Sequence, residues 1–285
     1  MGVSLQLKGI SLNMLVKRLV VALILVPIGL GVIILGGFVY AGVIAFILGL
    51  AVWEYNQLFH ASGLRPAGAL LLGGTLLIVF GRALNGFESA EWIISLLVLA
   101  SMTYHLLAYE KGRDLAGSDF SVTVTGVLYV GWLGAYLISL RSLPEGKWWV
   151  LLTMPTVWLI DVGAFVVGSQ LGRRHFSPRL SPRKTWEGLI GGLLAGALTG
   201  TLLAAAIQPA AGPLTSISPV RGALLGVLLA VLTPLGDLGE SLIKRQAGAK
   251  DSGKLLPGHG GAFDRIDSWL WAGVISYYLI VWFFI

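Results

Sequence analysis

The chain has 285 residues, of which 56% are hydrophobic and only 12% are charged. Soluble domains carry about 25% charged residues, and disordered chains contain far less apolar side chain than this one, so both classes are excluded. The absence of cysteine excludes disulfides, thiolate metal sites and cysteine nucleophiles, and the net charge of +6 makes the location of the basic residues informative.

Long uncharged runs predict transmembrane helices, because about 20 apolar residues cross the hydrocarbon core of a bilayer. The first run, 19–53, is too long for one helix and is interrupted at Gly36-Gly37, so it is divided in two. We therefore expect an all-α polytopic membrane protein with nine spans, at about 19–35, 38–58, 66–81, 91–109, 120–140, 148–169, 187–208, 220–242 and 266–285.

The distribution of basic residues supports this arrangement, because Lys and Arg accumulate in cytoplasmic loops. If the N-terminus is cytoplasmic, 16 of the 20 basic residues fall on the cytoplasmic side. The other four are Arg82, Arg141, Lys147 and Arg221. The sequence thus predicts a cytoplasmic N-terminus and an external C-terminus.

Five carboxylates lie in or beside the expected spans, next to two basic loops at 170–186 and 243–265. They are Asp161, Glu187, Asp237, Glu240 and Asp267. Ionisable groups at membrane depth are energetically costly and usually mark a functional cavity. For any one of them the alternative is a carboxylate near the water interface that a neighbouring Lys or Arg neutralises. Their gathering on one side favours the functional cavity.

The spacing of these residues predicts a metal site. Positions i, i+3, i+4 and i+7 of one helix form a stripe at its cytoplasmic end, and here they hold Asp237, Glu240, Ser241 and Lys244. Asp264 and Asp267 repeat the i, i+3 spacing at the start of the last span. Carboxylates that meet at one point repel one another unless cations bridge them. Because oxygen ligands suit Mg²⁺, we expect one or two Mg²⁺ ions there.

Two further segments are suited to phosphate. Ser181 before Pro182 predicts the N-cap and first residue of a helix, whose N-terminus would favour an anion near Arg183 and Lys184. The alternative is simple anchoring of this loop to anionic lipid. The glycine-rich segment 257–261 exposes backbone N–H groups to an anion, or is an ordinary turn. A metal, clustered bases and an open backbone together are typical of phosphoryl or nucleotidyl transfer.

Other features are interpreted as structural. Glu54 is expected near the cytoplasmic interface without a catalytic role, and His105 is expected to be hydrogen-bonded within the bundle. Glycines at every fourth position predict close helix packing. They are Gly188, Gly192, Gly196 and Gly200.

The segment 241–267 reads SLIKRQAGAKDSGKLLPGHGGAFDRID. Over its full length it closely resembles the signature of the phosphatidate cytidylyltransferases, also called CDP-diacylglycerol synthases. It departs at Ala262, where that family usually has a larger aliphatic residue. Segments 161–165 and 181–188 agree as well, whereas the first half of the chain agrees only in hydropathy and in Trp53-Glu54-Tyr55.

The resemblance implies that CTP and phosphatidic acid are joined to give CDP-diacylglycerol and pyrophosphate with the help of a divalent metal. It implies Asp237 and Asp264 as principal metal ligands, supported by Glu240 and Asp267. It also implies catalytic roles for Lys250, Asp251, His259 and Arg265. The expected substrate-binding residues are Ser181, Arg183, Lys184, Thr185, Ser241, Lys244, Arg245, Gly260 and Gly261.

We expect residues 148–285 to form the catalytic membrane domain, and residues 1–147 to supply scaffold or oligomer contacts, for instance in a homodimer. The expected location is the inner (plasma) membrane, with membrane lipids but no nucleic acid as partners. One alternative is a CTP-dependent transferase that acts on another lipid phosphate or a polyprenyl alcohol. Another is an ion-coupled transporter, but transporter sites lie near the bilayer midplane, whereas these carboxylates lie at cytoplasmic helix ends.

Overall fold

Apolar runs form α-helices throughout the computed structural model, which describes residues 26–253 and 260–285. Within these ranges there is no β-strand, and eight helical spans are long and apolar enough to cross a membrane. The fourth span, Ala116–Ser142, is made of α5 (Ala116–Gly126), the π-helix η1 (Val127–Trp132) and α6 (Tyr136–Ser142). The other seven are α2 (Gly37–Ala61), α3 (Gly68–Asn85), α4 (Ala90–Glu110), α7 (Gly146–Leu171), α8 (Trp186–Ala211), α9 (Pro219–Gln246) and α10 (Phe263–Phe283).

The expected all-α membrane protein is confirmed, and eight of the nine expected spans correspond to these helices. Of the first expected span, 19–35, the described part is a shorter apolar helix, Val26–Leu35, and the rest lies outside the described residues. α9 extends to Gln246 rather than 242, which places Lys244 on the helix. α8 likewise continues through Pro209 to Ala211, so the following loop is shorter than expected.

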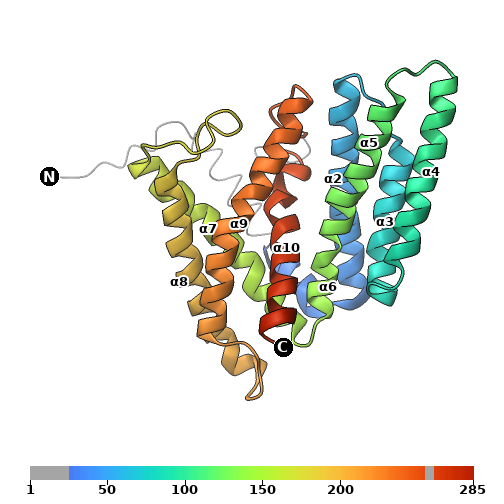
Figure 1. Ribbon diagram of the computed structural model, residues 1–285. Helices are drawn as coiled ribbons and strands as arrows, with labels where there is room; N and C mark the ends of the chain where they lie inside the picture. Colours follow the sequence, from blue (N-terminus) through green and yellow to red (C-terminus); the bar gives the residue numbers. More distant parts are fainter. Residues whose placement is uncertain (1–25, 254–259) are drawn as a thin grey trace.

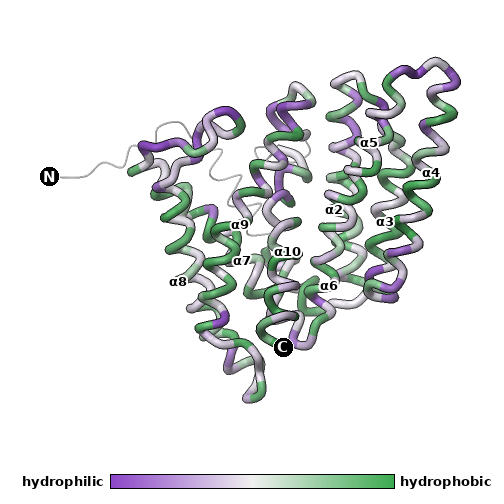
Figure 2. The backbone as a smooth tube through the Cα atoms, viewed as in Figure 1, coloured by the Kyte–Doolittle hydropathy of each residue, from purple (hydrophilic) through white to green (hydrophobic). Residues whose placement is uncertain are grey.

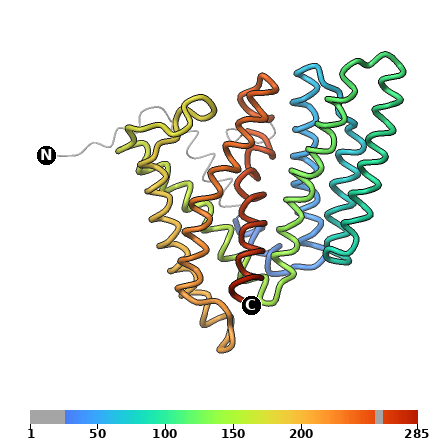
Figure 3. Tube along the Cα trace, in the orientation of Figure 1, coloured from blue at the N-terminus to red at the C-terminus, as the bar shows by residue number. Residues whose placement is uncertain are grey.

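Successive spans run in opposite directions, so the connecting loops gather at two ends of the molecule (Figure 1, Figure 3). We call the end with the loops 62–67, 111–115 and 172–185 and the α9–α10 connection the basic end, and the opposite end the far end. Of the described basic residues, four lie at or near the far end, as the charge pattern predicts. They are Arg82, Arg141, Lys147 and Arg221. α10 lies between the α7–α9 group and α2, and it contacts α2, α6, α7 and α9 (Figure 1).

The outer surface of the bundle is apolar, as a lipid-facing surface must be. On α8, leucines four residues apart are 59–66% exposed: Leu194, Leu198 and Leu202. A soluble monomer rarely leaves such a continuous apolar face in water. Figure 2 shows hydrophobic residues along the helices and hydrophilic residues gathered toward the ends.

The glycines of α8 bring three helices into backbone contact. A Cβ atom on Gly200 would run into the carbonyl oxygen of Gly222 on α9, and one on Gly196 would lie 2.5 Å from the carbonyl oxygen of Gly226. A Cβ atom on Gly188 would lie 2.9 Å from the carbonyl oxygen of Ala164 on α7. The close packing predicted from the four-residue glycine spacing is therefore confirmed.

The start of α8 differs from the expected one. Thr185 is the N-cap, and its hydroxyl accepts a hydrogen bond from Gly188 N at 3.1 Å, so the prediction of Ser181 as N-cap is wrong. Ser181 and Pro182 instead open a turn in which Lys184 N donates to Ser181 O at 3.1 Å. Pro suits the second position of such a turn as well as the first turn of a helix. The two local signals were therefore ambiguous.

Candidate active site

Three carboxylates meet at the basic end, where α9 and α10 pack together. Asp237 and Glu240 are one turn apart on α9, and Asp267 belongs to the start of α10. One oxygen of each lies within 4.8 Å of the others. Glu240 is only 1% exposed, and among the described residues its Oε1 has no hydrogen-bond partner. A buried, unpaired carboxylate oxygen beside two other carboxylates suits a hard divalent cation such as Mg²⁺, so this carboxylate trio fits the metal implied by the sequence.

Two lysines lie against the trio. Lys184, from the loop before α8, is 2.5 Å from Asp237 Oδ2 and donates to Pro234 O at 3.3 Å. Lys244 lies 2.8 Å from Glu240 Oε2 and 2.6 Å from Asp264 Oδ1. The side chain of Lys244 is 12% exposed, whereas the pair of Lys184 and Asp237 is open to solvent on both sides, at 20% and 39%. Lys244 is therefore the inner cation and Lys184 the outer one.

Asp264 is held by hydrogen-bond donors and does not belong to the trio. Besides Lys244, it accepts hydrogen bonds at Oδ2 from Ser252 N at 3.0 Å and Gly261 N at 2.8 Å, and Ser252 Oγ lies 2.9 Å from the same oxygen. The sequence suggested Asp237 and Asp264 as principal ligands, with Glu240 and Asp267 in support. The structure joins Asp237 to the two supporting residues, and it places Asp264 beside them across Lys244.

Asp161 approaches the trio from α7. It lies close enough to Asp237, Lys184 and Arg265 for their charges to act on it. Two residues further along, a Cβ atom on Gly163 would lie 3.0 Å from the carbonyl oxygen of Gly191, so this glycine permits the close contact between α7 and α8. The segment 161–165 thus contributes one carboxylate and one contact between helices.

Tyr129 is a residue of the site that the sequence did not indicate. It belongs to η1, and its hydroxyl accepts a hydrogen bond from Trp271 Nε1 at 3.3 Å and donates to Gly236 O at 3.5 Å. The charges of all three trio carboxylates act on it. π-Helical turns inside longer helices frequently occur at functional sites. A tyrosine in an apolar run carries no local signal of such a role.

The loop 172–185 is held by Glu187 and Thr185. Glu187 Oε2 accepts hydrogen bonds from Arg173 N at 3.1 Å and Arg174 N at 3.2 Å. Of the five carboxylates that the sequence singled out, three form the trio. Glu187 instead holds a loop, and Asp161 lies on α7 beside the trio. Thr185 is buried at the N-cap, whereas Arg183 is exposed.

The remaining expected site residues differ in burial. Ser241 and Gly260 are half-buried, and Gly261 is buried, with its N–H directed to Asp264. Arg245 donates to Ala249 O at 3.3 Å. The exposed side chains are those of Arg245, Lys250, Asp251 and Arg265. His259 lies outside the described residues.

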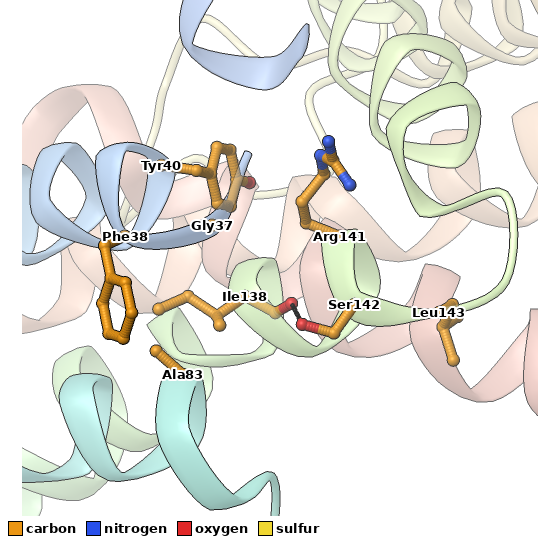
Figure 4. A pocket seen from close by; sticks show the side chains of 8 residues that line it. All are labelled: Gly37, Phe38, Tyr40, Ala83, Ile138, Arg141, Ser142 and Leu143. Carbon is orange, nitrogen blue, oxygen red and sulfur yellow. Dashed lines mark hydrogen bonds between the residues drawn. The ribbon is translucent and has the colours of Figure 1, made fainter. Parts of the chain in front are cut away.

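A cavity of about 340 Å³ opens at the far end, away from these carboxylates. Figure 4 shows the residues that line it. Its lining includes Tyr40, Ile138 and Arg141 but no carboxylate. Arg141 donates from Nε to Ile33 O at 2.8 Å, so it ties the helix Val26–Leu35 to α6. This cavity lacks the donor set of a metal site and is not the candidate active site.

Comparison with known proteins gives the family. A model of the cytidylyltransferase family matches residues 16–283, almost the whole chain. The chain belongs to the cytidylyltransferase family. The match includes both halves of the molecule, although the sequence motifs of the family resemblance lie mostly in the second half.

Curated relatives of this family member share about a third of its residues. The phosphatidate cytidylyltransferase of Synechocystis is 32% identical over 292 aligned positions, which cover 93% of this chain and 96% of that protein. That of Pseudomonas aeruginosa is 38% identical over 275 positions, covering 94% and 97%. That of Brucella suis is 34% identical over 268 positions, covering 91% of each.

Proposed function

We propose that the protein transfers the cytidylyl group of CTP to phosphatidic acid. A phosphate oxygen of the lipid attacks the α-phosphorus of CTP, a new P–O–P linkage forms, and the bond to the β-phosphate breaks. CDP-diacylglycerol and pyrophosphate are the products. The names of the relatives support this reaction, and the observation that carries it is the carboxylate trio flanked by Lys184 and Lys244 at the basic end.

The two substrates are polyanions, so bringing them together is the main electrostatic task. A phosphate monoester has a second pKa of about 6 and is largely ionised near neutral pH, so its oxygen needs no general base. Lys184 and Lys244 lie where incoming phosphates would approach the trio. Around them, Arg183, Arg245, Lys250 and Arg265 offer exposed positive charge for the triphosphate and the lipid phosphate.

Asp237, Glu240 and Asp267 would hold one or two Mg²⁺ ions. When bound, Mg²⁺ supplies charge neutralisation for the triphosphate and polarises the phosphoryl group. The chain's own residues do the rest. Lys244 keeps Glu240 and Asp264 at a fixed separation, and Asp264 holds the backbone of Ser252 and Gly261. For Asp251 and His259 we propose a role at the substrate phosphates by resemblance.

Incubation of the purified protein with radiolabelled CTP and Mg²⁺ tests the proposed reaction. With phosphatidic acid present, we expect label in the lipid fraction and release of pyrophosphate. A polyprenyl alcohol or another lipid phosphate in its place distinguishes the alternative transferases. Absence of labelled lipid with every acceptor would refute the proposal, and an ion-coupled transporter would then be the class to test.

We also propose that the basic end faces the cytoplasm in the inner membrane and that the protein forms a homodimer. The charge segregation between the two ends supports the orientation. Because the chain has no cysteine, Arg179→Cys and Lys147→Cys provide exposed probes at the basic and far ends. An impermeant maleimide should label the cysteine at position 147 in intact cells, and the one at 179 only after lysis. The reverse pattern would contradict the orientation.

A further inference from the structure

Glu54 makes a long-range connection to the loop that follows α9. It lies on α2, in the half of the chain with little family signature, and it is only 1% exposed. Its Oε2 accepts a hydrogen bond from Ser252 Oγ at 2.8 Å across 198 positions of sequence, and from Phe263 N at 2.9 Å across 209. A buried carboxylate is costly unless donors satisfy it; here Oε2 has two donors, whereas Oε1 has none among the described residues. These donors all come from the segment that leads into α10.

The bond from Phe263 N makes Glu54 a cap for α10. The first N–H groups of any helix have no partner within it, and Ala262, which precedes α10, provides no side-chain acceptor. Glu54 supplies the missing acceptor from a different helix, and a carboxylate is favourable at a helix N-terminus. The edge-to-face contact of Tyr55 with Phe263, at a centroid distance of 6.0 Å, adds apolar packing at the same point.

Gly253 and Gly261 approach this carboxylate closely. A Cβ atom on Gly253 would collide with Glu54 Oε1, and one on Gly261 would collide with Oε2. The absence of side chains at both positions therefore lets the backbone approach Glu54 from two sides.

Ser252 links Glu54 to the candidate active site, because it contacts both Glu54 and Asp264. Its hydroxyl lies 2.8 Å from Glu54 Oε2 and 2.9 Å from Asp264 Oδ2, and it accepts from Asp264 N at 3.3 Å. Asp264 then contacts Lys244, which contacts Glu240 of the trio. Five polar residues thus form one chain from α2 to the carboxylates: Glu54, Ser252, Asp264, Lys244 and Glu240.

We propose that Glu54 is a positioning residue: as a hydrogen-bond acceptor it fixes Ser252 and the start of α10, and so holds Asp264 and Lys244 against the trio. The proposal rests on the proposed function for its effect on turnover. In this role, the negative charge of Glu54 does not act on the substrate. A side chain that accepts the same hydrogen bonds without a charge should therefore serve nearly as well.

The test compares Glu54→Gln with Glu54→Leu. Gln keeps an acceptor oxygen where Oε2 lies, whereas Leu has a similar size and no acceptor. We expect Glu54→Leu to lower kcat about a hundredfold, since misplacement by about 1 Å has such an effect, with little change in KM for CTP. Glu54→Gln should restore kcat to within about threefold. Gln57→Ala, an exposed position one turn further along α2, is the matched control and should change nothing.

A second readout follows the loop itself and needs no turnover. Ala262 is 6% exposed, so a cysteine introduced as Ala262→Cys should react slowly with a maleimide. We expect at least tenfold faster labelling with Glu54→Leu and no change with Glu54→Gln. Thr153→Val removes a buried hydrogen bond to Ser276 away from the loop, and it should lower thermal stability without faster labelling.

Several outcomes would overturn the positioning role of Glu54. Wild-type kcat and slow labelling in Glu54→Leu would overturn the proposal, and so would a Gln variant that is inactive while its loop stays protected, because charge would then matter. If Glu54→Leu fails to insert, Ser252→Ala removes the next member of the chain and should give the same faster labelling. Slow labelling there would overturn the proposal too. An inactive wild-type protein with the expected labelling would contradict the proposed function alone.

Discussion

Replacing Asp264 by asparagine should destabilise the protein far more than replacing Asp237 by asparagine. The two substitutions are chemically identical, but the side chains have different partners. Asp237 is 39% exposed, and among the described residues its ion-pair partner is Lys184. Asp264 is 8% exposed and accepts hydrogen bonds from Lys244, Ser252 N and Gly261 N, and Ser252 Oγ lies 2.9 Å from it.

The magnitudes follow from these partners. An amide at position 264 keeps one oxygen, so its NH₂ group must face either Lys244 or the donors at Ser252 and Gly261. Two or three buried groups then lose their partner, at about 1–3 kcal/mol each, and we expect a loss of roughly 3–6 kcal/mol. For a chain of this size that corresponds to a decrease in Tm of roughly 6–12 °C. An exposed pair contributes about 0.2–1 kcal/mol, so Asp237→Asn should shift Tm by about 2 °C or less.

The assay measures Tm in detergent with and without Mg²⁺, together with turnover. A ligand at 100 times its Kd stabilises a folded protein by about 2.7 kcal/mol, so Mg²⁺ should raise the Tm of the wild type by roughly 5 °C. Asp237→Asn should lose that increase and at least about a hundredfold in kcat, while it stays folded. Equal Tm losses in the two variants would refute the assignment of Asp264 to the loop. Retained Mg²⁺ stabilisation in Asp237→Asn would refute the trio as metal site.

Two further predictions concern neighbours of the trio. Lys244→Met should lower Tm by roughly 6–10 °C, because removing one partner of a buried pair costs about 3–5 kcal/mol. Lys184→Met, from the more exposed pair, should lower Tm by about 2 °C or less. Equal Tm shifts of the two variants in thermal melts would contradict this difference. Tyr129→Phe should lower kcat about tenfold, because it removes the hydroxyl that joins Trp271 and Gly236 beside the trio, with a Tm change below about 3 °C. Its control, Tyr136→Phe, removes the hydroxyl bonded to Tyr278 at 2.8 Å near the far end and should leave kcat unchanged.

The parts of the fold that depend on local pattern could be predicted from the sequence. Apolar runs specify the spans, and the four-residue glycine spacing specifies a packed helix face. The stripe of Asp237, Glu240 and Lys244 follows from helical periodicity alone. His105, expected to be hydrogen-bonded, does contact Ser101 O at 2.7 Å.

The parts that depend on long-range contacts could not be predicted in this way. Asp264 and Asp267 look equivalent in the sequence, but one turn of helix directs Asp264 to the loop and Asp267 to the trio. Glu54 was expected near the interface and is buried because Ser252 and Phe263 reach it from the other half of the chain. Tyr129 lies in an apolar run without any neighbouring motif. No local spacing encodes these three placements.

The carboxylates at the basic end differ in their hydrogen-bond and ion-pair partners, and these differences indicate where a cation would bind. Backbone N–H groups bond to Glu187, to Asp264 and to Oε2 of Glu54, whose Oε1 has no partner among the described residues. Asp267 of the trio accepts one backbone hydrogen bond, from Ser268 N at 2.7 Å. Asp237 and Glu240 pair only with lysines among the described residues, and Glu240 Oε1 is left without a partner. Desolvated negative charge without donors is energetically unfavourable. A divalent ion would relieve it most at the trio, whereas the first group of carboxylates keeps the surrounding loops in place.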